Sequence, residues 1–272
     1  MGIKALIFDI DGTILNSHVT MTKLPYNALK ECHREGLFIC TATARSGRMV
    51  FRKEDLLWEH EFLLERGISY NGATIFDKPN HFYQHTAIPG SIVQHLVTRI
   101  LDYDDTLQIA LQHDDQYHAF KIPMTEEQLV GWGFRQDGII DFQKARQLST
   151  TKIMIFTGNQ DKPVDLSELY QSLVSEFSFS VNIILADSWK AIYIISKHAN
   201  KGKAINTLIS LYNIKPEEVA VFGDDTPDIG MFGHSIAMGN AHESLKRHAS
   251  FVTKTNDEEG VVFALTDYLK VI

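Results

Sequence analysis

Four groups of residues in this sequence carry side chains suited to phosphate chemistry. The groups are Asp9-Ile10-Asp11-Gly12-Thr13, Thr43, Lys201, and Asp224 with Asp228. Each falls at the end of a predicted apolar strand or opens the helix after one. Because open α/β sheets bind ligands at the carboxyl ends of their strands, a parallel sheet would gather these distant groups at one edge. The spacing therefore predicts one site assembled from four parts of the chain.

Phosphoryl transfer requires an in-line nucleophile, a cation against the oxygen charge, and donors for the equatorial oxygens. Asp9 can attack phosphorus, as carboxylates do when they form an aspartyl-phosphate. Asp11 can protonate the leaving oxygen and later deprotonate water, if the turn at Gly12 swings it back toward the site. Gly12 also allows a close backbone approach to phosphate. Thr43 offers a hydroxyl donor, and Lys201 offers a compact positive charge.

The acidic side chains also predict a metal site. Asp9, Asp224 and Asp228 would provide hard oxygen ligands, which suit a Mg²⁺ ion that keeps several of its waters. Each group has an ordinary structural alternative when taken alone. Asp-x-Asp-Gly is usually a turn, Thr43 could simply end a strand, and Lys201 could open a solvated helix, while Asp228 could cap one. Their occurrence together, in this order and context, favours function.

The elements around these groups alternate between strands and helices. Unbroken apolar runs, typical of strands buried on both faces, precede the acidic groups at 5–8 and 219–222, and another such run lies at 37–40. Helices are predicted at 24–35, 46–53, 201–212, 242–249 and 261–269, and short strands at 235–238 and 251–253. This alternation indicates a doubly wound α/β fold with a Rossmann-like parallel sheet.

The middle of the chain has a different pattern. Its predicted strands alternate polar and apolar residues, and Thr125 to Gln128 forms a capping box that opens a helix. We interpret residues 87–188 as an inserted α+β domain, and residues 1–86 and 189–272 as the doubly wound core. The chain length of 272 residues agrees with two domains.

Composition excludes several classes of function. A formal net charge of -8 argues against nucleic-acid binding, which needs a basic surface, and no apolar run approaches the ~18 residues of a membrane span. Cys32 and Cys40 are interpreted as small buried residues of a reducing compartment. We expect a cytoplasmic protein with no nucleic acid, membrane or obligate protein partner.

At these motifs the sequence resembles the haloacid dehalogenase superfamily, in particular its Cof-type sugar-phosphatase branch. The matching stretches are Phe8 to Thr13, Thr41 to Arg45, Asn71 to Ala73, Lys201 to Ala204, Gly223 to Asp228, Ala237 to Ala241 and Glu259 to Val261. They are spread over nearly the whole predicted core, about two-thirds of the chain. The resemblance implies a Rossmann-like core with a type IIB cap inserted between the second and third motifs.

The resemblance also implies roles for the residues. Asp9 would be the nucleophile and Asp11 the acid and base, while Thr43 and Lys201 would bind phosphate. Mg²⁺ would lie on Asp9, the Asp11 carbonyl and Asp224, with Asp228 nearby. The implied reaction is hydrolysis of a small phosphorylated metabolite, often a sugar phosphate. A phosphomutase, or a regulator that binds a phosphate ligand without hydrolysis, are the alternatives.

Two residues depart from the branch pattern. Ala44 stands where the branch usually has Gly, and it could constrain the phosphate loop. Pro227 stands where the branch usually has Asn, which removes a side-chain amide and a backbone N–H beside the predicted metal site. The more general superfamily pattern Gly-Asp-x-x-x-Asp is retained from Gly223 to Asp228.

Overall fold

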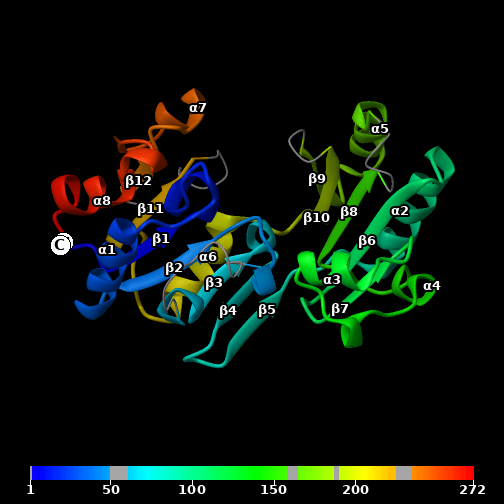
Figure 1. Ribbon diagram of the computed structural model, residues 1–272, viewed down its shortest axis with the longest axis horizontal. Coiled ribbons are helices and arrows are strands. Elements are labelled where there is room, and N and C mark those ends of the chain that lie inside the picture. Colours follow the sequence, from blue (N-terminus) through cyan, green and yellow to red (C-terminus); the bar gives the residue numbers. More distant parts are fainter. Residues whose placement is uncertain (1, 50–60, 158–164, 187–189, 225–233) are drawn as a thin grey trace. The chain divides into compact units, whose positions relative to one another are not determined.

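The structure is a computed structural model that describes residues 2–49, 61–157, 165–186, 190–224 and 234–272. These residues form two compact units (Figure 1). Unit 1 contains Met1–Gln84 and Asn200–Ile272, and unit 2 is the continuous segment His85–Ala199. Unit 2 is therefore an insertion in the chain of unit 1.

The described strands of unit 1 form one eight-stranded sheet in the order β13-β12-β11-β1-β2-β3-β4-β5. The strands are β1 (Ala5–Phe8), β2 (Phe38–Ala42), β3 (Arg66–Ser69), β4 (Thr74–Asp77), β5 (Phe82–His85), β11 (Val219–Gly223), β12 (His234–Ala237) and β13 (Phe251–Val252). The pairs from β13 through to β3 are parallel, and β4 pairs antiparallel with β3. The sheet is thus mostly parallel, with β1 inside it.

Helices cover both faces of this sheet. They are α1 (Lys23–Arg34), α6 (Lys201–Ser210), α7 (Glu243–Lys246) and α8 (Gly260–Phe263). Leu6 and Phe8 of β1 belong to the apolar cluster that includes α1 and α8, whereas Ala5 and Ile7 belong to the cluster that includes α6. Because successive strand residues face opposite sides, a strand covered on both sides is apolar throughout. The predicted doubly wound α/β fold is confirmed.

The two cysteines lie in this core, Cys32 in α1 and Cys40 in β2. Both are free, and neither is more than 1% exposed. Burial raises the pKa of the Cys32 thiol to about 11, and burial raises the pKa of Cys40 even further, because a thiolate is poorly solvated there. Both side chains therefore act as small apolar groups, as predicted.

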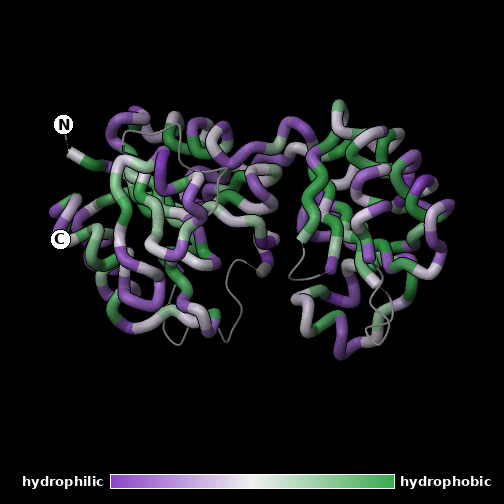
Figure 2. Tube along the Cα trace, turned by 90° about the horizontal axis from the view of Figure 1, so that it is seen from above, coloured by the Kyte–Doolittle hydropathy of each residue, from purple (hydrophilic) through white to green (hydrophobic). Residues whose placement is uncertain are grey.

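The described strands of unit 2 form a separate five-stranded sheet in the order β7-β6-β8-β10-β9. The strands are β6 (Leu107–His113), β7 (Tyr117–Phe120), β8 (Lys152–Thr157), β9 (Val181–Ala186) and β10 (Ala191–Ser196), all paired antiparallel. The helices are α2 (Gly90–Tyr103), α3 (Glu126–Gly131), α4 (Phe142–Ala145) and α5 (Ser167–Phe177). Apolar residues concentrate along these strands (Figure 2).

The strands of unit 2 show the alternation expected of an antiparallel sheet. Ile109 and Leu111 of β6 pack in the apolar cluster that includes α2 and α5, whereas Gln108 and Gln112 point to the other face. The predicted capping box is present at α3, where the Thr125 hydroxyl accepts from the Gln128 N–H at 3.2 Å. Across the described residues, no helix has both the length and the apolar character needed to cross a membrane.

One boundary differs from the prediction. The core was expected to resume at residue 189, but unit 2 continues to Ala199. The reason is β10, which pairs antiparallel with both β8 and β9 and so belongs to the inserted sheet. A second difference concerns the helix expected at 46–53, because a short 3₁₀ turn occupies Gly47–Met49 and residues 50–60 lie outside the described residues.

Acidification is expected to destabilise the protein through His113 in unit 2. This side chain is 7% exposed, and its Nδ1 donates to the Ser149 carbonyl at 2.7 Å. Burial lowers the pKa of His113 below its ordinary value, so between that ordinary value, about 6.5, and the lowered value the unfolded chain binds a proton that the folded chain does not. Stability that is fully present above pH 6.5 is therefore lost as the pH falls.

Urea unfolding at pH 7.5 and 5.5 measures this effect. The free energy of unfolding should fall less over that interval in His113→Gln than in the wild type. Burial also lowers the pKa of His85, so some pH dependence should remain in the variant. An equal fall in both proteins would contradict the assignment to His113.

Candidate active site

Asp9 is the first residue after β1. Its backbone N–H donates to the Phe222 carbonyl of β11 at 2.9 Å, which fixes the start of the loop that follows. The Asp9 carboxylate is 12% exposed, and its Oδ1 accepts a hydrogen bond from Lys201 Nζ at 3.1 Å. Lys201 is itself only 5% exposed. The predicted nucleophile and the predicted phosphate-binding lysine therefore form a largely buried ion pair.

This pairing governs the charge of Asp9. Burial raises the pKa of Asp9, because the carboxylate loses solvation, while the charge and the hydrogen bond of Lys201 act in the opposite direction. Only the ionised carboxylate is a nucleophile. Lys201 thus favours the ionised form of Asp9 in a place that would otherwise favour the neutral acid.

Lys201 is held by the start of α6. Asn200 caps this helix, and its side-chain oxygen accepts from the Lys203 N–H at 2.9 Å. Gly72 packs against the same turn with φ +95°, where an added Cβ would overlap the Asn200 carbonyl and lie 2.7 Å from the Lys201 nitrogen. The backbone contact at Gly72 therefore sets how closely the start of α6 approaches the core.

Gly12 brings the loop after Asp9 close to Asp224. The loop from Ile10 to Ile14 closes with a hydrogen bond from the Leu15 N–H to the Ile10 carbonyl at 3.0 Å, and Gly12 adopts φ +71° within it. A Cβ on Gly12 would overlap the Asp224 carboxylate, which directly follows β11. Gly12 thus suits the positive φ of this loop, and its lack of a Cβ allows the close approach of this carboxylate.

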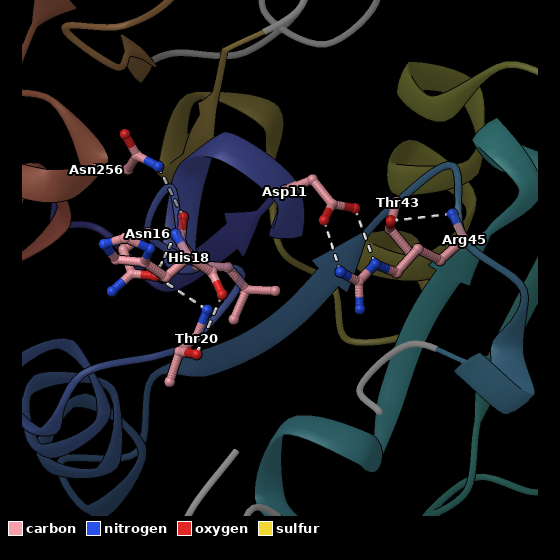
Figure 3. Close-up of polar contacts among 8 residues, drawn as sticks. Asp11, Asn16, His18, Thr20, Thr43, Arg45 and Asn256 are labelled. Carbon is pink, nitrogen blue, oxygen red and sulfur yellow. Dashed lines mark hydrogen bonds and ion pairs between the residues drawn. The ribbon is translucent and has the colours of Figure 1, made fainter. Parts of the chain in front are cut away.

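Asp11 is held by Arg45. Arg45 Nε donates to Asp11 Oδ2 at 2.8 Å, and Arg45 Nη2 donates to Asp11 Oδ1 at 2.6 Å (Figure 3). This is a bidentate arrangement, in which two parallel hydrogen bonds fix the carboxylate plane as well as its position. The Asp11 side chain is 55% exposed, so it remains open to a substrate.

Thr43 follows β2 in a tightly bonded stretch. Its N–H donates to the Ile68 carbonyl at 2.8 Å, and its own carbonyl accepts from the Asn71 N–H at 3.0 Å. The Thr43 hydroxyl oxygen accepts from the Arg45 N–H at 3.1 Å (Figure 3). An oxygen that accepts in this way keeps its own O–H for donation. Thr43 and Arg45 are therefore oriented by one another.

The contacts link several of the sequence-predicted residues in pairs. Asp9 contacts Lys201, and Gly12 adjoins Asp224. The contact of Arg45 with Asp11 was not predicted, and the position of Arg45 two residues after Thr43 is the one signal in the sequence that points to a role for it. Asp228, together with Asp225 and Pro227, lies outside the described residues. Ala44 is exposed and is not among the residues with positive φ, so its Cβ imposes no backbone strain on this loop.

The residues suit a hard cation in their chemistry. Within the described part of the chain there is no group of three or more His, Cys, Asp or Glu side chains placed to hold a metal. Asp9 and Asp224 nevertheless provide two carboxylates, and the absence of a side chain on Gly12 leaves room for the Asp224 carboxylate beside the loop that follows Asp9. These two carboxylates, together with a backbone carbonyl such as that of Asp11, are oxygen ligands of the kind that Mg²⁺ prefers. The ion usually keeps several waters as its other ligands.

Comparison with known families decides the class of this protein. The profile of the haloacid dehalogenase-like hydrolases matches residues 6–265, almost the whole chain. The chain belongs to this family. The expectation of a superfamily enzyme is therefore confirmed, and so is the family resemblance.

Two relatives of the hydrolase come from Bacillus subtilis strain 168. YwtE is 27% identical over 98% of both chains, and YitU is 23% identical over 98% of this chain and 97% of its own length. Each is named as a 5-amino-6-(5-phospho-D-ribitylamino)uracil phosphatase. Both relatives are thus named for phosphate-ester chemistry.

A solved structure shows the same fold. The haloacid dehalogenase subclass IIB sugar phosphatase BT4131 superposes with a TM-score of 0.77, at 22% identity, covering 99% of this hydrolase and all of the other chain. At this level of identity the likeness establishes the fold. It extends over both units, so the core and the insertion each have a counterpart.

The backbone contact at Gly72 predicts a large cost for Gly72→Ala. Gly36 provides a matched control, because it has φ +83° but nothing within 4 Å of an added Cβ. Gly36→Ala should lower the free energy of unfolding by about 1–2 kcal/mol, the cost of a left-handed conformation. Gly72→Ala should cost about 4 kcal/mol or more, because the contact with Asn200 is backbone and cannot rotate away. Urea unfolding of both variants decides this, and equal losses would show that conformation alone matters at Gly72.

Proposed function

We propose that this chain is a Mg²⁺-dependent phosphatase that hydrolyses a small phosphomonoester through an aspartyl-phosphate on Asp9. The observation that carries the proposal is the buried Asp9–Lys201 pair at the carboxyl end of the central strand. A buried carboxylate held beside a cation, with a second carboxylate two residues away, matches the requirements of phosphoryl transfer through an enzyme carboxylate.

The reaction proceeds in two steps. In the first, an Asp9 oxygen attacks phosphorus and forms the aspartyl-phosphate, while the bond from phosphorus to the ester oxygen breaks and Asp11 gives that oxygen a proton. In the second, water attacks phosphorus, Asp11 takes the proton of the water, and inorganic phosphate leaves with Asp9 restored. Thr43 and Lys201 donate hydrogen bonds to phosphoryl oxygens, and the open backbone at Gly12 allows their close approach.

The metal proposal rests on the same residues. Mg²⁺ would be held by Asp9, the Asp11 carbonyl, Asp224 and Asp228, and would neutralise charge on the phosphoryl oxygens. Enzymes of this superfamily generally use a divalent metal ion. In the structure Asp224 is placed against Gly12, next to the loop that starts at Asp9.

The substrate is a small phosphorylated metabolite, a sugar phosphate or a similar compound. The fold shared with a sugar phosphatase, and the named activity of YwtE and YitU on a phosphorylated ribityl compound, support this class. We assign the role of selectivity cap to unit 2. Its chain ends at Ala199, two residues before Lys201, so it interrupts the core between two phosphate-site motifs.

An assay with an aryl phosphate tests the proposal. The protein should release inorganic phosphate with Mg²⁺, lose this activity in EDTA, and regain it when Mg²⁺ is restored. Asp9→Asn should abolish turnover and leave the fold intact, because an amide of similar shape is not a nucleophile. Near-wild-type activity in Asp9→Asn would exclude the mechanism. Transfer of phosphate only to a second sugar hydroxyl would indicate a phosphomutase, and binding without turnover would indicate a regulator.

Arg45 is expected to act through Asp11. Arg45→Ala removes both hydrogen bonds to the carboxylate, and misplacement of a catalytic group by about 1 Å can cost ~10²-fold in rate. We expect kcat to fall by roughly that factor. Arg45→Lys should recover only part of it, because an ammonium cannot make the bidentate pair.

A double-mutant cycle separates this role from general damage to the site. If Arg45 acts only by positioning Asp11, then Arg45→Ala should have little further effect in an Asp11→Asn background. Steady-state kinetics of the four proteins measure the coupling. Rate losses that simply multiply would show that Arg45 works independently of Asp11.

A further inference from the structure

Residues 238–242 connect Asp224, which follows β11, with residues 10–15, the nucleophile loop that follows the proposed nucleophile Asp9. The backbone of this segment forms hydrogen bonds with Gly223, the last residue of β11, and with Asp224, which follows it. The Met238 N–H donates to the Gly223 carbonyl at 3.0 Å, and the His242 N–H donates to the Asp224 carbonyl at 3.3 Å. The segment therefore fixes the backbone that carries the Asp224 carboxylate.

The Asn240 side chain of the same segment reaches the nucleophile loop. Its Nδ2 donates to the Gly12 carbonyl at 2.8 Å, and its Oδ1 accepts from the backbone N–H of Asn256 at 3.0 Å. The second bond determines the orientation of the amide, because the group that faces a backbone N–H must be the oxygen. The amide nitrogen is thus directed at Gly12.

Gly12 is consequently contacted by two side chains, those of Asp224 and Asn240, whose backbones are linked by hydrogen bonds. Asp224 packs against its Cα, in the space that a side chain would fill, and Asn240 binds its carbonyl. Asp224 and Asn240 are joined by the backbone bonds of residues 238–242. A shift of Gly12 would therefore alter the separation of the Asp9 and Asp224 carboxylates.

A second asparagine contacts the same loop without contacting Gly12. Asn256 Nδ2 donates to the Leu15 carbonyl at 2.9 Å. This bond has the same chemistry as the one from Asn240 and ends three residues further along the loop. Asn256→Ala keeps the backbone N–H that orients Asn240, so it provides a matched control.

We propose that Asn240 is a positioning residue for the divalent metal site, which it maintains by holding Gly12 between Asp9 and Asp224. The proposal rests on the proposed function, because it takes these two carboxylates as metal ligands. Groups that orient metal ligands typically change metal affinity or activity by 10–100-fold when they are removed. The effect of Asn240 should fall in this range and should appear in binding of the metal itself.

The affinity for the metal can be measured without turnover by titrating the protein with Mn²⁺ and monitoring the free ion by electron paramagnetic resonance. Asn240→Ala should weaken Mn²⁺ binding about 10-fold or more, whereas Asn256→Ala should change it less than about 3-fold. Equal weakening in both variants would mean that only general loosening of the loop matters, and it would overturn the proposal. Wild-type affinity in Asn240→Ala would overturn it as well.

Asn240→Asp provides a second test if the alanine variant does not fold. The carboxylate has nearly the same shape but cannot donate to the Gly12 carbonyl. Its added negative charge would by itself strengthen cation binding, so weaker Mn²⁺ binding supports a geometric role, and unchanged or tighter binding contradicts it. A wild type that binds Mn²⁺ but releases no phosphate would refute the proposed function alone, and the variants would still decide the role of Asn240. A wild type that does not bind Mn²⁺ would overturn both.

Discussion

A carboxylate that is largely removed from water needs a compensating charge, and the site of this hydrolase is organised around that requirement at Asp9. Leaving one member of a buried ion pair alone typically costs 3–5 kcal/mol. The partner, Lys201, comes from 192 residues further along the chain. Its position therefore depends on the start of α6, which Asn200 caps and against which Gly72 packs without a side chain. Structural elements with no chemical role of their own thus contribute to the charge state of Asp9.

The register of the parallel sheet places the other groups at the same edge. Phe8 of β1 lies level with Thr41 of β2 and with Phe222 of β11. Asp9 lies one residue beyond Phe8. Thr43 and Asp224 each lie two residues beyond the positions that pair with Phe8. A shift in register on either side of β1 would move Thr43 or Asp224 along the strand direction by about 3.3 Å per residue. The continuous apolar faces of β1 and β11 oppose such a shift, because they pack between helices on both sides.

Sequence patterns predicted the parts of the fold that are governed by burial on two faces. The runs at 5–8 and 219–222 contain only apolar residues, and both are strands of the parallel sheet. The helix α2 was missed, since it begins after Pro89 with no side-chain cap to mark it. Strands β3 and β4 were missed because they are short and carry Arg66 and Asp77 at their ends. The buried Asp77 carboxylate accepts a hydrogen bond from the Tyr212 hydroxyl at 2.8 Å, and Tyr212 lies far along the chain, just after the end of α6.

Contacts between residues distant in sequence also limited prediction of the site. The types of Asp9, Asp11 and Lys201 indicated their chemistry. The bidentate pair between Arg45 and Asp11 depends on the relative position of the loop after β1 and the loop after β2. The periodicity of apolar residues in the sequence does not predict that position. The boundary at Ala199 was missed for a similar reason. The apolar run of β10 suits either unit, and only its pairing with β8 and β9 assigns it.

The insertion of unit 2 has a consequence for the order in which the chain assembles during synthesis. Unit 2 is continuous, so all of its strands and helices exist once residue 199 has been made. In contrast, β1 pairs with β11, and Ala5 can meet Val219 only after residue 219 has been made, which is later than the whole of unit 2. Until then β1 has an apolar strand edge without its partner, a feature that promotes aggregation. The strand that precedes Asp9 is thus made before unit 2 but gains its β11 partner only after unit 2 is complete.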